Sequence, residues 1–205
     1  MNVEIFDLLA KKFAENGFDL YMVGGTSRDF LLARKLVDFD FATNAKTYEI
    51  RKFLPDASYT FEKYGIVQYT LNGHKCDIAM FRTEEKYDDA RHPSVIKFVK
   101  SINEDYKRRD FTINAIYIDK NYETIDPSNG LYDLKEEIIR TIGIPEERIK
   151  EDPLRIIRAY RFSLILDFKL EGSLKKAMID NVHLLSKIKR EKILEEFRKI
   201  EKANS

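Results

Sequence analysis

The sequence of 205 residues lacks the features that mark secreted and membrane-bound proteins. It has one cysteine, Cys76, so no disulfide can form within the chain. The amino-terminal residues include acidic side chains where a secretion signal would be basic and then continuously apolar. No apolar run approaches the roughly 20 residues that a membrane helix requires, and no repeat or low-complexity segment is visible. These absences predict a reduced, cytoplasmic protein.

An excess of charge of one sign is also lacking. Lys and Arg together number 36 and Asp and Glu 35, which gives a formal net charge of +1. Proteins that hold nucleic acid through a global basic field carry much more positive charge. We therefore expect any polyanionic partner to be bound by local groups of basic residues.

The first third of the chain has the pattern of alternating helices and strands. Apolar residues at helical spacing predict a helix over residues 3–15, followed by a short buried strand over 19–23. Helical spacing returns over 27–36, and alternation of apolar and acidic residues over 37–43 predicts another strand. The chain length of 205 residues allows one sizeable domain with an appendage or two small domains.

The middle of the chain predicts a hairpin and a long loop. Asn72-Gly73 stands between two β-rich runs, 65–71 and 75–81, and is typical of the tight turn of a hairpin. Residues 83–105 are polar and lack a sustained period, so we expect a long loop that contains one short strand. Residues 108–119 predict a helix that leads into a strand. From about residue 145 onward only helical patterns remain.

Two aspartates one residue apart, Asp38 and Asp40, lie in the strand predicted over 37–43. Residues i and i+2 of a strand point to the same face about 6.5–7 Å apart, so the two carboxylates should lie side by side. Like charges so placed repel unless a cation lies between them, and Mg²⁺ prefers carboxylate oxygens. Two divalent ions roughly 3.5–4 Å apart are the usual device for nucleotidyl transfer, and Asp77 is the candidate for a third carboxylate. A solvated strand face is the alternative interpretation of the pair alone.

A pair of glycines, Gly24-Gly25, precedes this motif between a strand and a helix. Glycine lets the backbone approach a phosphate closely, and the N–H groups at the start of the helix near Thr26 favour an anion. Arg28 in the first turn can add a charge-assisted hydrogen bond. A tight turn alone would explain the glycines, whereas the order strand, GG, helix, strand, D-x-D is more specific.

In this order, the residues GGTSRDFLLARKLVDFDFAT resemble the first signature of the class II tRNA nucleotidyltransferase and bacterial poly(A) polymerase family, within the DNA polymerase beta superfamily. Four further segments resemble the later signatures of the family and follow in the same order: RRDFTINA (108–115), DPSNGLYDLKEEIIR (126–140), EDPLRIIRAYRF (151–162) and KREKILEEFRKI (189–200). The resemblance implies an α+β fold: a nucleotidyltransferase head with a mixed β-sheet and flanking helices over 1–143, and an all-α neck over 144–205.

The resemblance also implies roles for the motifs. Asp38 and Asp40 would bind two catalytic Mg²⁺ ions, one of which activates the 3′-hydroxyl of the RNA for in-line attack on an α-phosphate. Arg109, Asp110 and Asn114 follow at spacings that would place Asp110 and Asn114 on one helix face, and the family role is selection of ribose over deoxyribose. An N-terminal helix cap with a polar helix face is the alternative interpretation.

Asp152 and Arg155 are three residues apart in a predicted helix, so their side chains should be adjacent. Asp accepts and Arg donates, which matches the amino donor and ring-nitrogen acceptor that cytosine and adenine share and that guanine and uracil do not. This agrees with the family's choice of CTP and ATP, although such a pair is more often a surface ion pair. Arg158 and Arg161 continue the same helical stripe, where they would face a triphosphate, the tRNA acceptor stem or solvent.

The flexible loop of the family is matched by Y-x-D-x-R-x-P, here Tyr87, Asp89, Arg91 and Pro93. Family members that add only CC characteristically have this motif shortened or missing.

The chain departs from the family pattern in two ways. It has Thr26-Ser27 where a small residue and then valine are usual, and Ala33 where a glycine is common. The body and tail domains that hold the tRNA elbow in the family are expected to be absent, so a homodimer or a partner protein could supply the grip on RNA.

These motifs lead to one functional hypothesis with alternatives. The chain is expected to add all or part of CCA to tRNA 3′ ends from CTP and ATP. A-adding or poly(A) polymerase activity is the nearest alternative. A non-catalytic nucleotide-binding module or subunit is the alternative from a different class, and the intact Asp38, Asp40, Asp152 and Arg155 argue against it.

Overall fold

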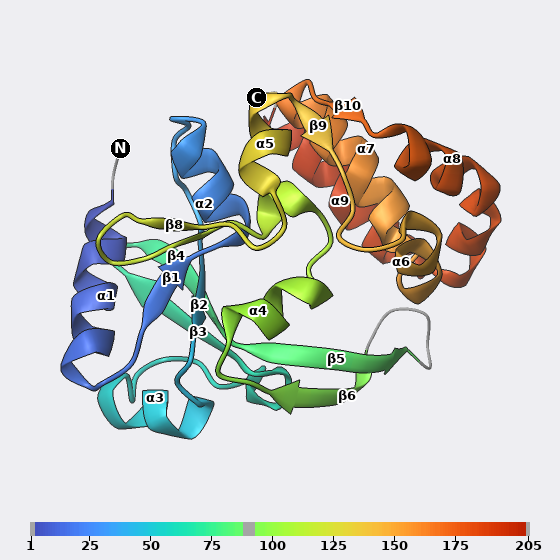
Figure 1. Cartoon of the computed structure of the whole chain (residues 1–205). Helices are drawn as coiled ribbons and strands as arrows, with labels where there is room; N and C mark the ends of the chain where they lie inside the picture. Colours follow the sequence, from blue (N-terminus) through green and yellow to red (C-terminus); the bar gives the residue numbers. More distant parts are fainter. Residues whose placement is uncertain (1–2, 88–92, 204–205) are drawn as a thin grey trace. The chain divides into compact units, whose positions relative to one another are not determined.

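The structure is a computed structural model that describes residues 3–87 and 93–203, with the backbone alone described for 85–87, 93–94 and 202–203. The chain divides into two compact units. Figure 1 shows the helices and strands of the chain, coloured along the sequence. Unit 1 comprises Met1–Thr83, Ile96–Arg108 and Asn114–Ser128, and unit 2 comprises Glu84–Val95, Arg109–Ile113 and Asn129–Ser205.

Unit 1 is built on a mixed six-stranded sheet. The strand order is β3-β4-β2-β1-β7-β8. Strands β2 and β4 pair in parallel, and the other neighbours pair antiparallel. The mixed sheet expected from the sequence is therefore confirmed. The elements of the unit are α1 (Glu4–Glu15), β1 (Leu20–Met22), α2 (Gly24–Leu31), β2 (Phe39–Thr43), α3 (Thr47–Phe53), η1 (Glu62–Tyr64), β3 (Ile66–Leu71), β4 (His74–Met80), α4 (Ile102–Asp105), η2 (Tyr106–Arg108), β7 (Tyr117–Ile118) and β8 (Thr124–Ile125).

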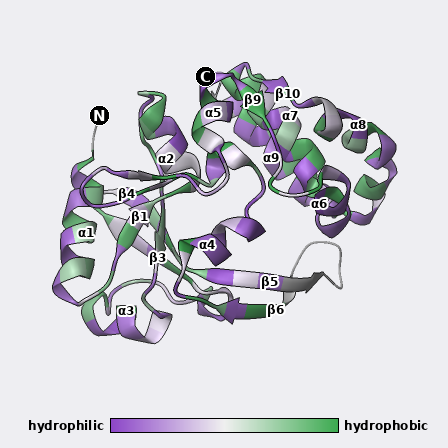
Figure 2. Cartoon of the chain, in the orientation of Figure 1, coloured by the Kyte–Doolittle hydropathy of each residue, from purple (hydrophilic) through white to green (hydrophobic). Residues whose placement is uncertain are grey.

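The core of unit 1 lies between α1 and one face of the sheet. Apolar side chains of α1, at the spacing read from the sequence, pack against Met22, Phe41 and Ile78 from three neighbouring strands. The turns of α1 carry both hydrophobic and hydrophilic residues, as expected for a helix with one buried face (Figure 2). The packed residues of α1 are Ile5, Phe6, Leu9, Ala10 and Phe13.

The hairpin predicted from Asn72-Gly73 is confirmed. Strands β3 and β4 pair antiparallel, and Leu71 is paired with His74 across the turn. Asn72 and Gly73 both have positive φ values, 51° and 79°, which is the conformation that these two residue types adopt most readily. The turn fixes the register that places Asp77 on β4.

The prediction of a long loop with one strand over 83–105 is wrong in part. Two strands form a separate two-stranded sheet, β5 (Arg82–Tyr87) and β6 (Pro93–Phe98). The sequence of β5, RTEEKY, is mostly charged, so it has no apolar alternation to reveal a strand. Pairing with β6 supplies backbone hydrogen bonds that the local sequence does not predict.

Unit 2 is mostly helical and contains a small parallel sheet. Helix α7 packs against α9, and α6 packs against α8. Strand β10 pairs in parallel with β9. The expectation that residues 144–205 are all helical is therefore wrong at Lys169–Leu170, which form this strand. The elements are α5 (Gly130–Lys135), β9 (Ile138–Ile139), α6 (Pro145–Glu151), α7 (Leu154–Leu166), β10 (Lys169–Leu170), α8 (Gly172–Asp180), η4 (Val182–Lys187) and α9 (Arg190–Ala203). The domain boundary at residue 143 stays a prediction, while the compact units divide the chain after Ser128.

The helix expected at the start of 108–119 does not form. Arg109 and Asp110 lie in a bend, and only a single 3-10 turn, η3 (Thr112–Asn114), follows. Backbone groups that an α-helix would pair internally are bonded elsewhere: Thr112 N–H donates to Arg140 C=O (3.0 Å), and Ile142 N–H donates to Asp110 C=O (3.1 Å). These long-range bonds override the local helical pattern.

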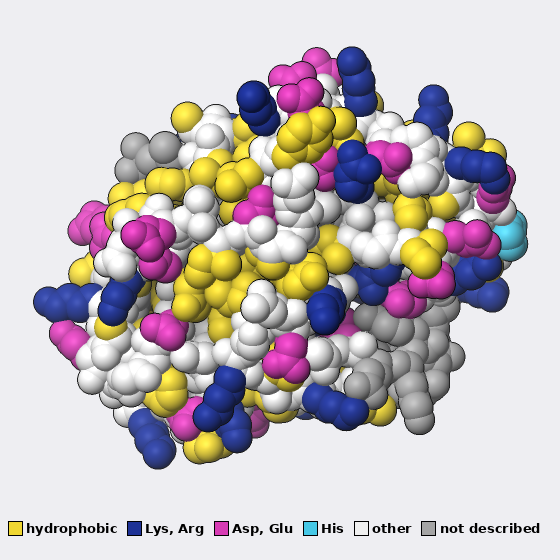
Figure 3. Space-filling model, in the orientation of Figure 1, with side chains coloured by type: hydrophobic (Ala, Val, Ile, Leu, Met, Phe, Trp, Pro, Cys, Tyr) yellow, Lys and Arg dark blue, Asp and Glu magenta, His cyan; other side chains and the backbone are white. Residues whose placement is uncertain are grey.

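No helix in the described ranges is long and apolar enough to cross a membrane. On the face drawn in Figure 3, Lys and Arg side chains are interspersed with Asp and Glu. This distribution agrees with the net charge of +1.

A buried carboxylate in unit 1 gives a first testable prediction. Asp105 is fully buried, and it accepts hydrogen bonds from the Arg82 amide (3.0 Å), Arg108 Nε (2.8 Å) and the Tyr117 hydroxyl (2.6 Å). Replacing Tyr117 with phenylalanine removes one donor from a charge that water cannot reach. We expect the free energy of unfolding to fall by about 2 kcal/mol, measured by urea denaturation.

Tyr122→Phe is the matched control for this change. Tyr122 also donates its hydroxyl to a carboxylate, that of Asp7, but this bond lies at the exposed surface. Its loss should change the free energy of unfolding by much less, because water replaces the lost donor. Equal losses in the two variants would contradict the role given to burial at Asp105.

Candidate active site

The two aspartates of the D-x-D motif lie at the start of β2. Asp38 directly precedes the strand and Asp40 is its second residue. Both are exposed, whereas Phe39 between them is 1% exposed and packs in the core. The alternation expected from the sequence is therefore present, and it directs both carboxylates away from the core.

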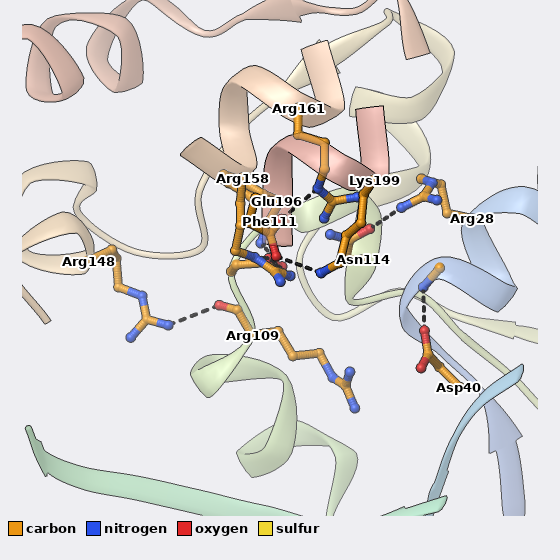
Figure 4. A network of polar contacts seen from close by, with 12 residues as sticks. Arg28, Asp40, Arg109, Phe111, Asn114, Arg148, Arg158, Arg161, Glu196 and Lys199 are labelled. Carbon is orange, nitrogen blue, oxygen red and sulfur yellow. Dashed lines mark hydrogen bonds and ion pairs between the residues drawn. The ribbon is translucent and has the colours of Figure 1, made fainter. Parts of the chain in front are cut away.

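The glycine pair lets the backbone approach Asp40 closely. Gly24 has a φ of +66°, and a Cβ atom at this position would lie 3.1 Å from Asp40 Oδ2. The Gly25 amide donates a hydrogen bond to the same oxygen (3.2 Å; Figure 4). A side chain at residue 24 would be strained and would crowd the carboxylate. The Gly25 amide, at the start of α2, thus orients the Asp40 carboxylate.

Asp77 is the neighbour of Asp40 on the adjacent strand. The two residues are directly paired in the parallel register of β2 and β4, so they share a face of the sheet. Asp77 Oδ1 accepts a hydrogen bond from Gln68 Nε2 (2.8 Å) and lies 3.9 Å from Lys75 Nζ. Gln68 and Lys75 also line a cavity of about 560 Å³ at the β3 edge. Within the described ranges, no three Asp, Glu, His or Cys side chains converge as ligands of one metal ion.

Arg28, proposed from the sequence as a phosphate ligand, has protein partners. Its Nε donates to Asp29 Oδ1 (2.9 Å), and its Nη1 donates to Asn114 Oδ1 (2.9 Å; Figure 4). The residue is 7% exposed. Arg28 thus ties α2 to the end of η3 within unit 1 and fixes the orientation of the Asn114 amide.

The segment 109–113 is built into unit 2. Thr112 donates its hydroxyl to Asp133 Oδ2 (2.7 Å), and Asp133 also accepts from Arg140 Nε (3.0 Å). Phe111 packs edge-on against Phe162 of α7, with ring centroids 5.6 Å apart. The DPSNGLYDLKEEIIR motif, which supplies Asp133 and Arg140, therefore holds the RRDFTINA motif in place.

Asp110 and Arg109 have different partners within unit 2. Asp110 Oδ2 accepts two hydrogen bonds from Arg158, one of them from Nε at 2.8 Å. The backbone carbonyl of Arg109 accepts from Arg148 Nη2 (3.0 Å), and the Arg109 side chain extends away from Arg148 (Figure 4). The sequence predicted that Asp110 and Asn114 lie on one helix face, and this prediction is wrong. No α-helix forms there, and the two residues belong to different units.

A carboxylate of α9 organises the arginine stripe of α7. Glu196, which is 4% exposed, accepts from Arg161 Nε (2.7 Å) and from Lys199 Nζ (2.6 Å). Burial alone would lower the pKa of Arg158, but the charges of Asp110 and Glu196 outweigh it and raise that pKa. Burial lowers the pKa of Arg161, against the opposing charge of Glu196. Sequence reasoning missed Glu196, since its partner lies 35 residues away.

The arrangement expected for Asp152 and Arg155 is corrected. Asp152 is not in the helix with Arg155 but ends α6 in an extended conformation, and its Oδ1 accepts from the Leu154 amide (3.0 Å). Arg155 Nη1 donates to Glu151 Oε2 (2.9 Å) and to the Arg148 carbonyl. Proline at residue 153 is the signal for this break, because proline disrupts a helix interior.

The flexible-loop residues lie largely outside the described part of the chain. Asp89 and Arg91 fall between residues 87 and 93, which bound the described backbone. Tyr87 ends β5 and Pro93 begins β6. Their roles stay predictions.

The sequence of the chain is similar to those of known proteins. The family described as the poly A polymerase head domain matches residues 20–140. The CCA-adding enzyme of Lactobacillus delbrueckii subsp. bulgaricus is 44% identical over 190 residues, which are 93% of this chain and 48% of that enzyme. This chain therefore spans about half the length of the curated relatives it matches.

Solved structures show the same fold. The crystal structure of the Bacillus stearothermophilus CCA-adding enzyme in complex with CTP has a TM-score of 0.87 and 35% identity, and the match covers 97% of this chain and 48% of that one. A tRNA nucleotidyltransferase complexed with a primer tRNA and an incoming ATP analog has a TM-score of 0.74 and 32% identity, with 94% and 54% covered. By sequence and by fold, the chain belongs to the poly A polymerase head-domain family, and CCA-adding enzymes are among its relatives.

Proposed function

We propose that the chain is a template-independent RNA nucleotidyltransferase that adds CMP and AMP, from CTP and ATP, to tRNA 3′ ends. The observation that carries this proposal is the exposed pair Asp38 and Asp40 at the start of β2, with Asp40 oriented by the Gly25 amide. The relatives named as CCA-adding enzymes support the choice of reaction.

The donor set at this site suits Mg²⁺. Mg²⁺ is usually bound by one or two carboxylates, together with substrate phosphates and water, so it does not require three protein carboxylates. Asp38 and Asp40 would hold it, and Asp77 is proposed to add negative charge from the neighbouring strand. When bound, Mg²⁺ would supply charge that stabilises the transferring phosphoryl oxygens.

The residues of the chain orient these groups before substrate arrives. The Gly25 amide fixes Asp40, and Arg28 fixes the Asn114 amide, which we propose for the nucleotide ribose. Groups held in place by the fold need little reorganisation as charge develops in the transition state. Arg109, Asp110, Arg158 and Arg161 are also proposed as nucleotide-binding residues.

Base selection is proposed for Asp152 and Arg155. Asp accepts and Arg donates, as the shared edge of cytosine and adenine requires. The described hydrogen bonds of the Arg155 side chain come from Nη1, which leaves Nε and Nη2 as donors toward a base. Holding Nη1 against Glu151 would keep the guanidinium in one orientation.

The proposal is tested by nucleotide addition at single-nucleotide resolution. The purified chain is incubated with Mg²⁺, each labelled nucleoside triphosphate in turn, and tRNA transcripts that end before CCA, after C or after CC. We expect CTP to enter at the first two positions and ATP at the third, with no addition of UTP or GTP. Addition of ATP alone to CC ends would mean A-adding activity, and continued ATP addition would mean poly(A) polymerase activity.

The control for this assay is the double variant Asp38→Ala with Asp40→Ala, which should be silent. Binding of CTP and ATP without extension of any transcript would contradict the proposal of a self-sufficient enzyme. That result would favour a nucleotide-binding subunit that needs a partner for RNA.

A further inference from the structure

The hydroxyl of Thr26 lies at the backbone of the D-x-D motif. The Asp40 amide donates a hydrogen bond to Thr26 Oγ1 (2.6 Å), and the hydroxyl in turn faces the Asp38 carbonyl oxygen (3.5 Å). Thr26 is 1% exposed. One buried side chain of α2 therefore contacts the backbone of both aspartates.

The reason for this contact lies in the way β1 ends. The β1–β2 register runs from Leu20 opposite Thr43 to Met22 opposite Phe41, and the Val23 amide continues it by donating to the Asp40 carbonyl (3.1 Å). In an antiparallel pair of this kind the two residues exchange both bonds, so the Asp40 amide would next donate to the Val23 carbonyl.

The Val23 carbonyl is used elsewhere, because the chain turns into α2 at Gly24. It accepts from the Ser27 amide (3.5 Å) as part of the first helical turn. The Thr26 hydroxyl takes its place as acceptor for the Asp40 amide. The bond is partly buried, and an amide shielded from water is costly to leave without a partner, so an acceptor at position 26 stabilises this arrangement.

We propose that Thr26 is a positioning residue for the metal-binding aspartates. Its hydroxyl replaces a missing backbone acceptor and fixes the D-x-D segment against the start of α2, while the Gly25 amide fixes the Asp40 carboxylate. The inference rests on the proposed function, since it assumes that Asp38 and Asp40 hold the metal.

The test compares Thr26→Val, which keeps the shape and removes the hydroxyl, with Thr26→Ser, which keeps the hydroxyl. Ser27→Ala is the matched control, because Ser27 is equally buried and its hydroxyl faces the Gly24 carbonyl (3.4 Å) and not the aspartates. Mn²⁺ affinity is measured by electron paramagnetic resonance, with the Asp38→Ala, Asp40→Ala double variant as the baseline.

We expect Thr26→Val to weaken Mn²⁺ binding about 10–100-fold, the usual effect of removing a group that orients a metal ligand. Thr26→Ser and Ser27→Ala should bind Mn²⁺ like the unaltered chain. Unchanged binding in Thr26→Val, or equal weakening in Ser27→Ala, would overturn the proposal.

Two further readouts keep the test decisive. Hydrogen exchange of the Asp40 amide, measured by NMR on the unaltered chain, should be slow, and fast exchange would overturn the proposal even if Thr26→Val does not fold. Nucleotide addition is measured on the same variants. If the unaltered chain binds Mn²⁺ at the aspartates but extends no RNA, the proposed function fails while the role of Thr26 stands.

Discussion

Nucleotide addition by the Asp40→Asn variant is expected to be about 10³-fold slower than by the unaltered chain, since removing one electrostatic group from a transition state costs about 10²–10³-fold. Asparagine has the same shape as aspartate, and its oxygen can still accept the hydrogen bond from the Gly25 amide. The fold should therefore be kept while the negative charge is lost. Single-turnover rates at saturating CTP measure the effect.

Asp167→Asn is the matched control for this variant. Asp167 is exposed at the end of α7, with a φ of 60° that asparagine also tolerates. The same change of charge there should leave the rate unaltered. A rate for Asp40→Asn within about tenfold of the unaltered chain would place Asp40 outside the catalytic centre.

The second large effect is expected at Glu196, and it is an effect on stability. Replacing Glu196 with alanine removes the carboxylate that binds Arg161 and Lys199 and leaves a largely buried guanidinium without this partner. Breaking a buried pair in this way costs about 3 kcal/mol of unfolding free energy. Urea denaturation at neutral pH measures the loss.

Glu195→Ala is the control on the same helix. Glu195 pairs with Lys192 at the exposed surface, where an ion pair contributes less than about 1 kcal/mol. If both variants lose the same stability, the buried network around Glu196 does not stabilise unit 2 in the way its contacts indicate.

The contribution of Glu196 should depend on pH with a definite sign. Burial raises the pKa of Glu196, but the hydrogen bond from Lys199 and the charges of Arg158 and Arg161 outweigh it, so the pKa lies below its ordinary value. A group of this kind stabilises the fold above its unfolded pKa and loses that contribution as the pH falls through its folded pKa. The stability difference between the unaltered chain and Glu196→Ala should be constant near neutral pH and shrink below about pH 4.3. A difference that grows on acidification would contradict this sign.

The features predicted from the sequence are those set by neighbouring residues. The helix at Glu4–Glu15 follows from apolar spacing, and the turn at Asn72-Gly73 follows from two residues that tolerate positive φ. The exposure of Asp38 and Asp40 follows from strand alternation around Phe39. Each of these signals is complete within a few residues.

The features that were missed depend on contacts between distant residues. Arg158 reaches Asp110 across 48 positions, and Glu196 reaches Arg161 across 35. Local periodicity carries no signal for either pair. The helix wrongly expected around Asp110 fails for the same reason, because residues 140–142 take its backbone hydrogen bonds.

The site illustrates the same distinction. The sequence identified the glycine pair and the D-x-D motif, but it gave no sign that the Gly25 amide donates a hydrogen bond to Asp40. The role of Thr26 depends on where β1 ends, which the sequence does not show. Because the strand ends there, the Asp40 amide has the Thr26 hydroxyl as its acceptor in place of a backbone carbonyl of β1.

The most direct test of the catalytic centre is a crystal structure of the chain with CTP and Mn²⁺, with the metal located by its anomalous scattering. We predict a Mn²⁺ ion at about 2.1 Å, a normal metal–oxygen bond, from carboxylate oxygens of Asp38 and Asp40 and in contact with the triphosphate. Bound CTP with its metal held by other side chains would contradict the assignment of these two aspartates as the catalytic centre.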